Sequence, residues 1–382
     1  MTAGSESRLS VPTTPDAGAK RQMDELFRMM QKVNASDLHL KAGAPPLMRI
    51  ADNIQVLKMQ ALAAEQVQRL VYSILRPEQA KKFEVANDLD FSYQFDEGGR
   101  VRVSVFRDRG TVNLAARLVK SAILGFEELH LPPILGDIAS AKQGLVLICG
   151  PTGSGKSTTL AAMVQHINRT RRCHIVTIED PIEFLFKDDK SFIHQRELGV
   201  DVESWDTALK HVVRQDPDVI VIGEMRDAAT FTAGLRAAET GHLVFGTLHS
   251  ADVAQSMSRV FDMFPSDERE AARRAMSLNI HAVICMKLLR SCLQGVPLAP
   301  ALEIMIANPT VRRLIREAEE GKLLDAIRAG KDEGMCDFTQ TLVELVKKDW
   351  VTTREAQENA PNADELKMAL RGVHLTHKGF VG

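Results

Sequence analysis

The sequence lacks an excess of charge of either sign, a long hydrophobic run and a paired-cysteine motif, and each absence excludes a class of protein. Its 48 Lys and Arg residues nearly balance its 50 Asp and Glu residues, for a formal net charge of −2, so the overall charge gives no indication of nucleic-acid binding. No apolar run approaches the roughly 18 residues of a membrane-spanning helix. Residues 1–20 are rich in Ser, Thr, Pro and Gly and lack the apolar core of a signal peptide. We therefore expect no direct membrane insertion, and we expect any membrane association to depend on a protein partner.

The five cysteines are scattered along the chain, and none forms a C-x-x-C pair. This spacing argues against a structural zinc site and is typical of a protein of the reducing cytoplasm. Of the 382 residues, 45% are hydrophobic and 26% are charged, a composition typical of soluble globular proteins. A chain of this length is expected to fold as two or three domains.

The first third of the chain predicts a small α+β domain. Residues 1–20 are predicted to be disordered from their composition, and the apolar residues between Met23 and Val33 then follow helical spacing. Residues 100–105 alternate strictly, which predicts a half-buried strand with a basic outer face, and a turn at residues 96–99 predicts a hairpin. We therefore predict a domain over residues 21–120 and a linker over residues 121–135.

From Gly144 onward, short apolar strands alternate with helical stretches. The predicted strands are residues 144–149, 174–178, 218–222 and 242–248, and the helices between them include residues 205–214 and 228–239. Such alternation predicts a parallel sheet with helices on both faces, and thus an α/β domain over residues 136–382. The tail from Ser266 is predicted to be mostly helical, with residues 265–268 as a helix start.

The most informative motif lies between the first of these strands and its following helix. It reads Gly150, Pro151, Thr152, Gly153, Ser154, Gly155, Lys156 and Ser157, a complete G-x-x-x-x-G-K-S phosphate-binding loop, and Thr158 opens the helix. Glycines let successive backbone N–H groups face phosphate oxygens, and the helix N-terminus adds partial positive charge. Lys156 is expected to reach the β- and γ-phosphates and Ser157 to hold Mg²⁺. Because an ordinary glycine-rich turn rarely has this strand–loop–helix context, the motif predicts nucleoside triphosphate binding.

Acidic residues follow two other predicted strands. Glu224 ends the strand at residues 218–222 and comes after Gly223, where an ordinary P-loop enzyme has Asp, so it is either an atypical Mg²⁺-associated carboxylate or merely a strand end. Residues 179–184 crowd three carboxylates, Glu179, Asp180 and Glu183, around Pro181. Such crowding suits a cation or a proton transfer, although a solvated turn explains it equally well.

Histidine and arginine residues supply two further candidates. His242 begins the strand at residues 242–248, and His249 follows at its carboxyl end. His249 is either a sensor of the γ-phosphate, which is the more specific interpretation, or a core or cap residue whose hydrogen bonds are made within the protein. Zinc is disfavoured because no other ligand cluster accompanies the pair. The first domain has three arginines within a stretch of eight residues: Arg102, Arg107 and Arg109. They form either a solvated strand face or a group offered to a triphosphate across a subunit boundary.

Taken in order, these segments resemble the secretion ATPase superfamily, the hexameric motors of type II secretion and type IV pili. The likeness extends over about residues 22–372 and rests on five segments: Ala-Ser-Asp-Leu-His-Leu at residues 35–40, the phosphate loop, an "Asp box" at 179–184, Gly-Glu-Met-Arg-Asp at 223–227 and a "His box" at 240–249. The chain lacks the four-cysteine zinc module of the assembly motors. Residues 310–317, Thr-Val-Arg-Arg-Leu-Ile-Arg-Glu, are similar to the AIRNLIRE motif of retraction motors but depart from it in the first four residues. The chain thus resembles the pilus retraction branch, of PilT or PilU type.

The resemblance implies a PAS-like N-terminal domain, a RecA-like P-loop ATPase domain with a helical C-terminal region, and a homohexamer that binds ATP at the interdomain cleft. It implies that Ser157 with Glu224 handles Mg²⁺, Glu183 polarises the attacking water and His249 reports on the γ-phosphate. Arg102, Arg107 and Arg109 would complete the site. The expected location is the cytoplasmic side of the inner membrane, through the pilus platform protein and the pilus machinery.

The segment that follows Asn308 and Pro309 predicts a helix, because Asn is a good N-cap and Pro suits the first helical position. Val311, Leu314, Ile315 and Ala318 would line one face, with i,i+4 pairs Arg313–Glu317 and Arg316–Glu320 on others. The plainer interpretation is a helix packed on its own domain. The resemblance suggests that Arg312, Leu314, Ile315 and Arg316 also couple the nucleotide state to the pilus machinery, with both arginines exposed.

Three functions remain open from the sequence. They are a motor for pilus retraction and twitching motility, an assembly or secretion motor of the same superfamily, and a P-loop kinase of small molecules. The missing cysteines argue against the second. The third would need an acceptor pocket and would leave an N-terminal domain with an arginine cluster unexplained.

Overall fold

The structure is a computed structural model that describes residues 16–51, 53–95 and 98–372. Contacts divide the chain after Ser121 into two compact units, each with a sheet of its own. This is the predicted fold class, an N-terminal α+β domain followed by an α/β ATPase domain.

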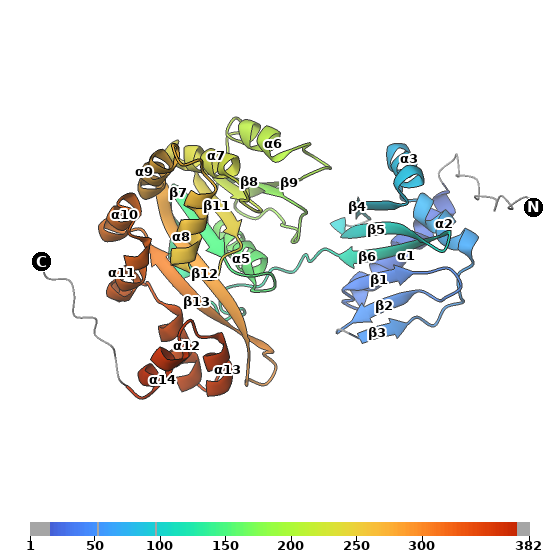
Figure 1. Cartoon of the computed structure of the whole chain (residues 1–382). Helices are drawn as coiled ribbons and strands as arrows, with labels where there is room; N and C mark the ends of the chain where they lie inside the picture. The colour runs from blue at the N-terminus through green and yellow to red at the C-terminus, as the bar shows by residue number, and fades with distance from the viewer. Residues whose placement is uncertain (1–15, 52, 96–97, 373–382) are drawn as a thin grey trace, which may run out of the picture. The chain divides into compact units, whose positions relative to one another are not determined.

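The first unit is a six-stranded antiparallel sheet with helices packed against it (Figure 1). Its elements are α1 (Ala17–Lys32), β1 (Asp37–Leu40), β2 (Leu47–Ile50), β3 (Asn53–Val56), α2 (Ala64–Tyr72), α3 (Pro77–Ala86), β4 (Asp88–Gln94), β5 (Arg100–Asp108) and β6 (Thr111–Leu118). The strand order is β3-β2-β1-β6-β5-β4. Val101, Val103 and Val105 are buried at alternate positions of β5, as the alternating sequence predicted. They join apolar residues of α1 and α2 in one core.

The structure bears on two predictions for this unit, one about where its first helix begins and one about its hairpin. Residues 17–20, predicted to be disordered, belong to α1, because the Asp16 side chain caps the helix by accepting from the Ala19 N–H at 2.9 Å. Residues 1–15 lie outside the described residues. The predicted hairpin joins β4 and β5, which pair antiparallel, although part of its turn, residues 96 and 97, is also outside the described residues.

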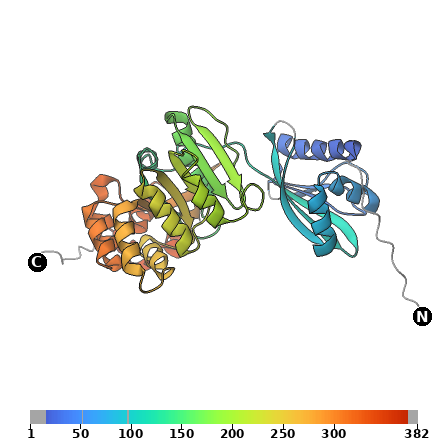
Figure 2. The same cartoon turned by 90° about the horizontal axis from the view of Figure 1, so that it is seen from above.

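The second unit is built on a seven-stranded sheet in the order β13-β12-β7-β11-β10-β8-β9 (Figures 1 and 2). Neighbouring strands run parallel except β12 and β13. Its strands are β7 (Gly144–Cys149), β8 (His174–Glu179), β9 (Phe192–Glu197), β10 (Val219–Ile222), β11 (Leu243–Leu248), β12 (Ile280–Arg290) and β13 (Leu298–Ile306). Its α-helices are α4 (Ile134–Ala139), α5 (Lys156–Thr170), α6 (Trp205–Val212), α7 (Ala228–Glu239), α8 (Val253–Asp262), α9 (Arg269–Asn279), α10 (Pro309–Arg316), α11 (Leu323–Ala329), α12 (Phe338–Lys347), α13 (Thr353–Asn359) and α14 (Ala363–Leu370).

The sheet is buried on both faces, which explains the unbroken apolar character of its central strands. In β7, Leu145 and Leu147 pack into the cluster that includes α7, α8 and α9, while Val146 and Ile148 pack on the other face with α4 and α5. Every residue of β7, β10 and β11 is buried. This double burial is typical of parallel sheets covered by helices.

Three strands of the second unit were not predicted. The tail from Ser266, predicted to be mostly helical, contains β12 and β13, which extend the sheet beyond β7. The third is β9, which forms the opposite edge beside β8. The predicted linker also includes ordered core residues, because Leu131 and Leu135 are buried in the second unit.

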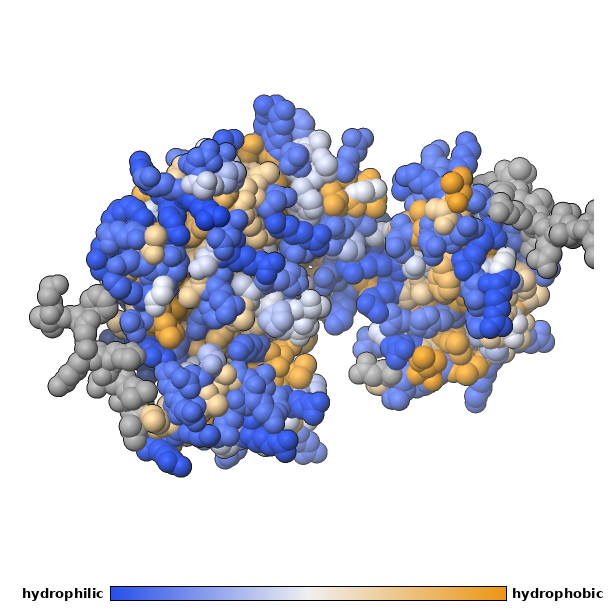
Figure 3. Space-filling view, viewed as in Figure 1, coloured by the Kyte–Doolittle hydropathy of each residue, from blue (hydrophilic) through white to orange (hydrophobic). Residues whose placement is uncertain are grey.

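In the part of the chain that the structure describes, no helix combines the length and apolar composition that a bilayer crossing requires. The face seen in Figure 3 is covered mainly by hydrophilic residues. Apolar residues gather there only in small groups.

Candidate active site

The phosphate loop joins the carboxyl end of β7 to the first residue of α5, as the sequence predicted. Gly150 has a φ of 152°, and a Cβ atom there would lie 2.4 Å from Ser154 Oγ and 2.6 Å from the Met286 carbonyl oxygen. A side chain at this position would therefore push the loop away from β12. Glycine is the residue that permits the close approach.

Lys156 is the first residue of α5 and is buried. Its Nζ donates to the carbonyl oxygens of Gly150 at 2.7 Å and Pro151 at 3.0 Å. Burial lowers the pKa of Lys156, while Cys149, Glu224 and Glu183 act in the opposite direction. An ammonium has three N–H donors, of which these two hydrogen bonds use two. The side chain is thus held against the loop beside a cavity in which phosphate oxygens can be bound.

Glu224 follows β10, and Gly223 before it fits a tight space. A Cβ at Gly223 would lie 3.1 Å from the Ile178 carbonyl oxygen and 3.2 Å from the Glu179 Cα, so the aspartate usual in P-loop enzymes would crowd the end of β8. The Glu224 carboxylate accepts from Arg226 Nη2 at 2.7 Å, and this hydrogen bond holds the pKa of Glu224 below its ordinary value. Glu224 is therefore ionised at neutral pH.

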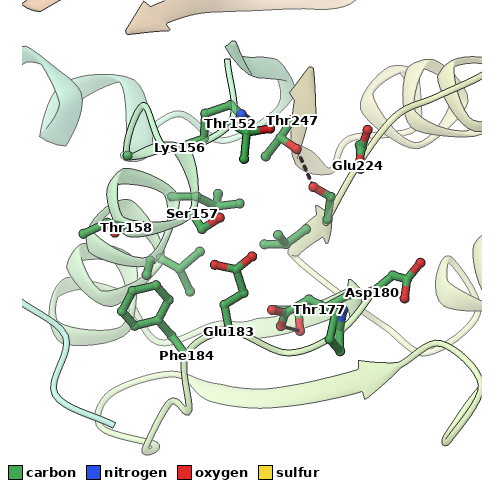
Figure 4. A pocket seen from close by; sticks show the side chains of 18 of the residues that line it. Thr152, Lys156, Ser157, Thr158, Thr177, Asp180, Glu183, Phe184, Glu224 and Thr247 are labelled. Carbon is green, nitrogen blue, oxygen red and sulfur yellow. Dashed lines mark hydrogen bonds between the residues drawn. The ribbon is translucent and has the colours of Figure 1, made fainter. Parts of the chain in front are cut away.

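The Asp box forms the loop that leaves β8. Glu179 is half-buried, and burial raises its pKa, although hydrogen bonds from Thr177, Gln195 and the Glu183 backbone oppose the shift. Glu183 differs, since its side chain is exposed. In Figure 4 the Glu183 carboxylate points into the cavity toward Ser157. Both carboxylates line the cavity, but Glu183 is the more exposed of the two, and Glu179 already accepts hydrogen bonds from Thr177 and Gln195.

His249 comes directly after β11, with Nε2 3.6 Å from Glu224 Oε1. Burial and then the charge of Lys156 lower the pKa of His249, so its imidazole is neutral at neutral pH. The contact with Glu224 is too long for a hydrogen bond and is not an ion pair in that state. The His249 carbonyl oxygen accepts from Arg259 of α8 at 2.6 Å, which fixes the backbone at the end of the strand.

These residues share one cavity of about 550 Å³ at the carboxyl ends of the strands (Figure 4). Its lining includes Thr152, Gly153, Gly155, Lys156, Ser157, Thr158, Glu183, Glu224 and His249. Sequence elements up to about a hundred residues apart thus meet where an open parallel sheet binds its ligands. Gly150, Pro151 and Ser154 complete the loop behind this lining. His242, in contrast, lies at the other end of β11, where Nδ1 bonds to the Ala237 carbonyl oxygen at 2.8 Å.

The three arginines belong to the first unit. Arg107 Nη2 bonds to Glu84 Oε1 at 2.9 Å, and its guanidinium lies over the Phe83 ring, so it has a structural role within the unit. Arg102 is half-buried on β5 opposite Arg117 of β6. Arg109 is exposed in the β5–β6 turn with a φ of 48°.

The predicted coupling helix exists as α10, but several of its side chains are not where the sequence placed them. Arg312 was expected to be exposed. Instead it is half-buried, and its guanidinium donates to the carbonyl oxygens of Ser277 at 2.7 Å, Leu278 at 2.6 Å and Ala307 at 3.1 Å. Burial also lowers its pKa. Leu314 and Ile315 are buried in the core, so they cannot contact a partner directly.

Arg316 is exposed, as expected, and the Arg313–Glu317 pair is present at 3.5 Å. The expected Arg316–Glu320 pair is wrong, because the buried Glu320 side chain bonds to Arg273 of α9. Ala318 does not extend the apolar face, since α10 ends at Arg316 and Ala318 is exposed with a φ of 61°.

Several supporting residues were missed. Arg226 lies two residues after Glu224 and could have been found as a charge beside a carboxylate. Thr247 Oγ1 donates to the Gly223 carbonyl oxygen and so ties the ends of β10 and β11 together (Figure 4). Gln195 and Arg259 bond to backbone about ten residues earlier in the chain, and no pattern in the sequence marks such contacts.

Comparison with known proteins agrees with this geometry. Residues 16–323 match the family described as "Type II/IV secretion system protein". The chain is 40% identical to the type IV pilus retraction ATPase PilT of Pseudomonas aeruginosa over 336 residues, which cover 88% of this chain and 97% of that protein. It is 34% identical to the type IV pilus ATPase PilU of the same organism, over 92% of this chain and 91% of that protein.

The fold gives the same result. A crystal structure of the pilus retraction motor PilT with bound ADP superposes with a TM-score of 0.83 at 40% identity, and the match covers 90% of this chain and 98% of that one. The sequence match to PilT extends over nearly the whole of the two proteins and includes the N-terminal unit as well as the phosphate loop. The chain therefore belongs to the type II/IV secretion system protein family and, within it, to the PilT-type retraction ATPases.

Proposed function

We propose that this chain is a ring-forming motor that hydrolyses ATP to retract type IV pili and so supports twitching motility. One observation carries the proposal: the phosphate loop, Glu183, Glu224 and His249 line a single cavity at the carboxyl ends of four strands. A binding loop alone would suit any nucleotide-binding protein. A binding loop facing an exposed carboxylate has the parts needed for hydrolysis.

In this proposal the backbone of residues 150–158 and the Lys156 ammonium hold the triphosphate. Glu183 takes the proton of the attacking water, because its carboxylate points into the cavity and lies close enough to Lys156 to influence its pKa. Neutral His249 senses the γ-phosphate as a hydrogen-bond donor rather than as a cation. Glu179, the alternative base, is half-buried and already accepts hydrogen bonds from Thr177 and Gln195.

Ser157 and Glu224 are proposed to hold Mg²⁺, which would neutralise charge on the phosphates. The donor set fits, since Mg²⁺ prefers oxygen ligands, keeps several waters and takes few protein groups. Glu224→Gln preserves the shape of the side chain but removes its charge. The Mg²⁺ concentration for half-maximal activity should then rise about tenfold. An unchanged Mg²⁺ dependence would exclude Glu224 from this role.

The ring and the role of the arginines are proposed together. A homohexamer would let arginines of one subunit complete the site of the next, and Arg109, which is exposed, is better placed for this than Arg107, which bonds to Glu84. Mixing an Arg102→Ala or Arg109→Ala variant with Lys156→Ala should restore part of the ATPase activity, because some interfaces would combine an intact loop with intact arginines. Failure to complement in mixed hexamers would assign these arginines to a solvated face.

The cellular role is proposed to be at the cytoplasmic face of the inner membrane, through the pilus platform protein, with exposed Arg316 as part of the coupling surface. A deletion strain tests the direction of the motor. Surplus surface pili without twitching would support retraction, whereas loss of pili would indicate an assembly motor. Purified protein tests the remaining alternative, because a hexamer that hydrolyses ATP without an added acceptor is not a small-molecule kinase.

A further inference from the structure

The strand β9 was absent from the sequence prediction, yet it lies directly beside the strand that carries the Asp box. It pairs in parallel with β8, so that Gln195 is opposite Thr177 and Glu197 is opposite Glu179. The chain between β8 and β9 includes Glu183. Side chains at the end of β9 therefore lie against the loop that connects β8 to β9.

Gln195 makes three hydrogen bonds to this loop and its base. Its Nε2 donates to the Phe184 carbonyl oxygen at 2.8 Å and to Glu179 Oε1 at 3.1 Å, and its Oε1 accepts from the Phe186 N–H at 3.0 Å. A backbone N–H can only donate, which fixes the orientation of the amide. The side chain thus bonds to the chain immediately after Glu183 and, through Glu179, to the chain before it.

The carboxylates of Glu179 and Glu197 also accept hydrogen bonds from the backbone of this loop. Glu197 Oε2 accepts from the Ile182 N–H at 3.2 Å, and Glu179 accepts from the Thr177 hydroxyl at 2.6 Å and from the Glu183 backbone. Glu197 is buried and Glu179 is half-buried, whereas the Glu183 side chain is exposed. The backbone around Glu183 is therefore held by hydrogen bonds, while its carboxylate is exposed toward the cavity, as is that of Asp180 at the start of the loop.

This arrangement matters because a general base works only from a narrow range of positions. Misplacement by about 1 Å can cost a hundredfold in rate, and a site is held in place by hydrogen bonds from the residues around it. We propose that Gln195 is a positioning residue that sets the location of the Glu183 carboxylate through the Phe184 and Phe186 backbone. The inference rests on the proposed role of Glu183 as the base, and Gln195 itself does not line the cavity.

The amide is suited to this position for a chemical reason. The loop presents an acceptor at Phe184, a donor at Phe186 and an acceptor at Glu179, and a glutamine amide matches all three. An apolar side chain of equal length offers neither kind of group. A carboxyl group has at most one donor, so it must lose at least one of the two donated hydrogen bonds.

The test is a double-mutant cycle on the full-length chain with Gln195→Met and Glu183→Gln, and Gln215→Met at an exposed position serves as the matched control. Single-turnover ATP hydrolysis, the KM for ATP, binding of a fluorescent ATP analogue and the thermal unfolding midpoint are measured for each protein. Gln195→Met should lower kcat by about ten- to a hundredfold and leave KM within about twofold. In the Glu183→Gln background the same change should have almost no further effect, since the group that it positions is gone.

The outcomes separate the two claims. Wild-type turnover in Glu183→Gln would overturn the proposed base, whatever Gln195 does. A Gln195→Met defect that persists in full in the Glu183→Gln background, or one expressed in KM alone, would overturn the positioning role and leave the base intact. If Gln195→Met does not fold, Gln195→Glu replaces it, with the same expected loss of kcat at constant KM. Wild-type kcat in that folded variant would also contradict the inference.

Discussion

The central and outer strands of the second sheet differ in what they contribute. The segments that follow the central strands β7, β8, β10 and β11 carry residues that line the cavity, among them Lys156, Glu183, Glu224 and His249. The outer strands β9, β12 and β13 contribute few lining residues but hold these ends in place. On β9 this is done by Gln195 and Glu197, and on β13 by Glu303, which accepts from the Val253 N–H at 2.8 Å at the start of α8.

The difference shows that chemistry and support are separable in this fold. Residues that follow the central strands line the cavity, so their replacement should change activity without much change in stability. Residues on the outer strands meet other parts of the chain, so their replacement should act on stability or, as for Gln195, on the position of a central residue. The predictions below test this division.

Lys156→Ala is expected to have the largest effect. Removal of the ammonium leaves the charge of the β- and γ-phosphates uncompensated, and turnover should fall about a thousandfold. The thermal midpoint should change little, because the hydrogen bonds lost at the Gly150 and Pro151 carbonyl oxygens are offset by removal of a charge that burial disfavours. Steady-state ATPase assays and calorimetry check both values. Turnover above about a tenth of wild type would show that the loop does not hold the phosphates.

Glu303→Gln should change stability in a pH-dependent way. Burial raises the pKa of Glu303 from 4.5 to about 7. Between these two pH values, the folded chain therefore keeps a proton on Glu303 that the unfolded chain has already released. The free energy of unfolding therefore falls as pH rises through this window, by roughly 3 kcal/mol in total. Glutamine does not titrate, and the variant should lack this decline. Unfolding at about pH 5 and about pH 8 measures it, and an equal decline in both proteins would contradict the assignment.

Arg312→Ala should have a smaller effect, about 1–2 kcal/mol of stability, because the carbonyl groups of Ser277, Leu278 and Ala307 lose their donor. The matched control is Arg316→Ala, at an exposed position of the same helix, which should stay within about 0.5 kcal/mol of wild type. Chemical denaturation of both variants gives the values. If Arg312→Ala kept wild-type stability while twitching failed, Arg312 would belong to the coupling surface after all.

The division also explains how far the sequence could be interpreted. The phosphate loop was predictable because its contacts are local: glycines, lysine and helix start follow one another, and the motif specifies its own conformation. Glu183, Glu224 and His249 were predictable because each lies in a segment that follows an apolar strand. The alternating helices and strands then place such ends together at one edge.

Gln195 and Arg312 were not predictable for the opposite reason. Gln195 bonds to a loop about ten residues away in sequence, and neither periodicity nor composition marks such a contact. Helical spacing placed Arg312 beside the apolar stripe of α10, but its long side chain reaches back to the end of α9. The strands β12 and β13 were hidden because their Met, Leu and Ala residues suit helices as well as buried strands, and the sheet decides between the two.

The central claim is that the loop of β7 binds ATP and the loop of β8 hydrolyses it. The most direct measurement follows the fate of bound ATP in Glu183→Gln, with affinity and single-turnover cleavage determined on the same sample. We expect affinity within about threefold of wild type and cleavage slowed at least a hundredfold, since an amide keeps the shape but cannot accept the proton of water. Cleavage at the wild-type rate, or loss of ATP binding, would contradict the account.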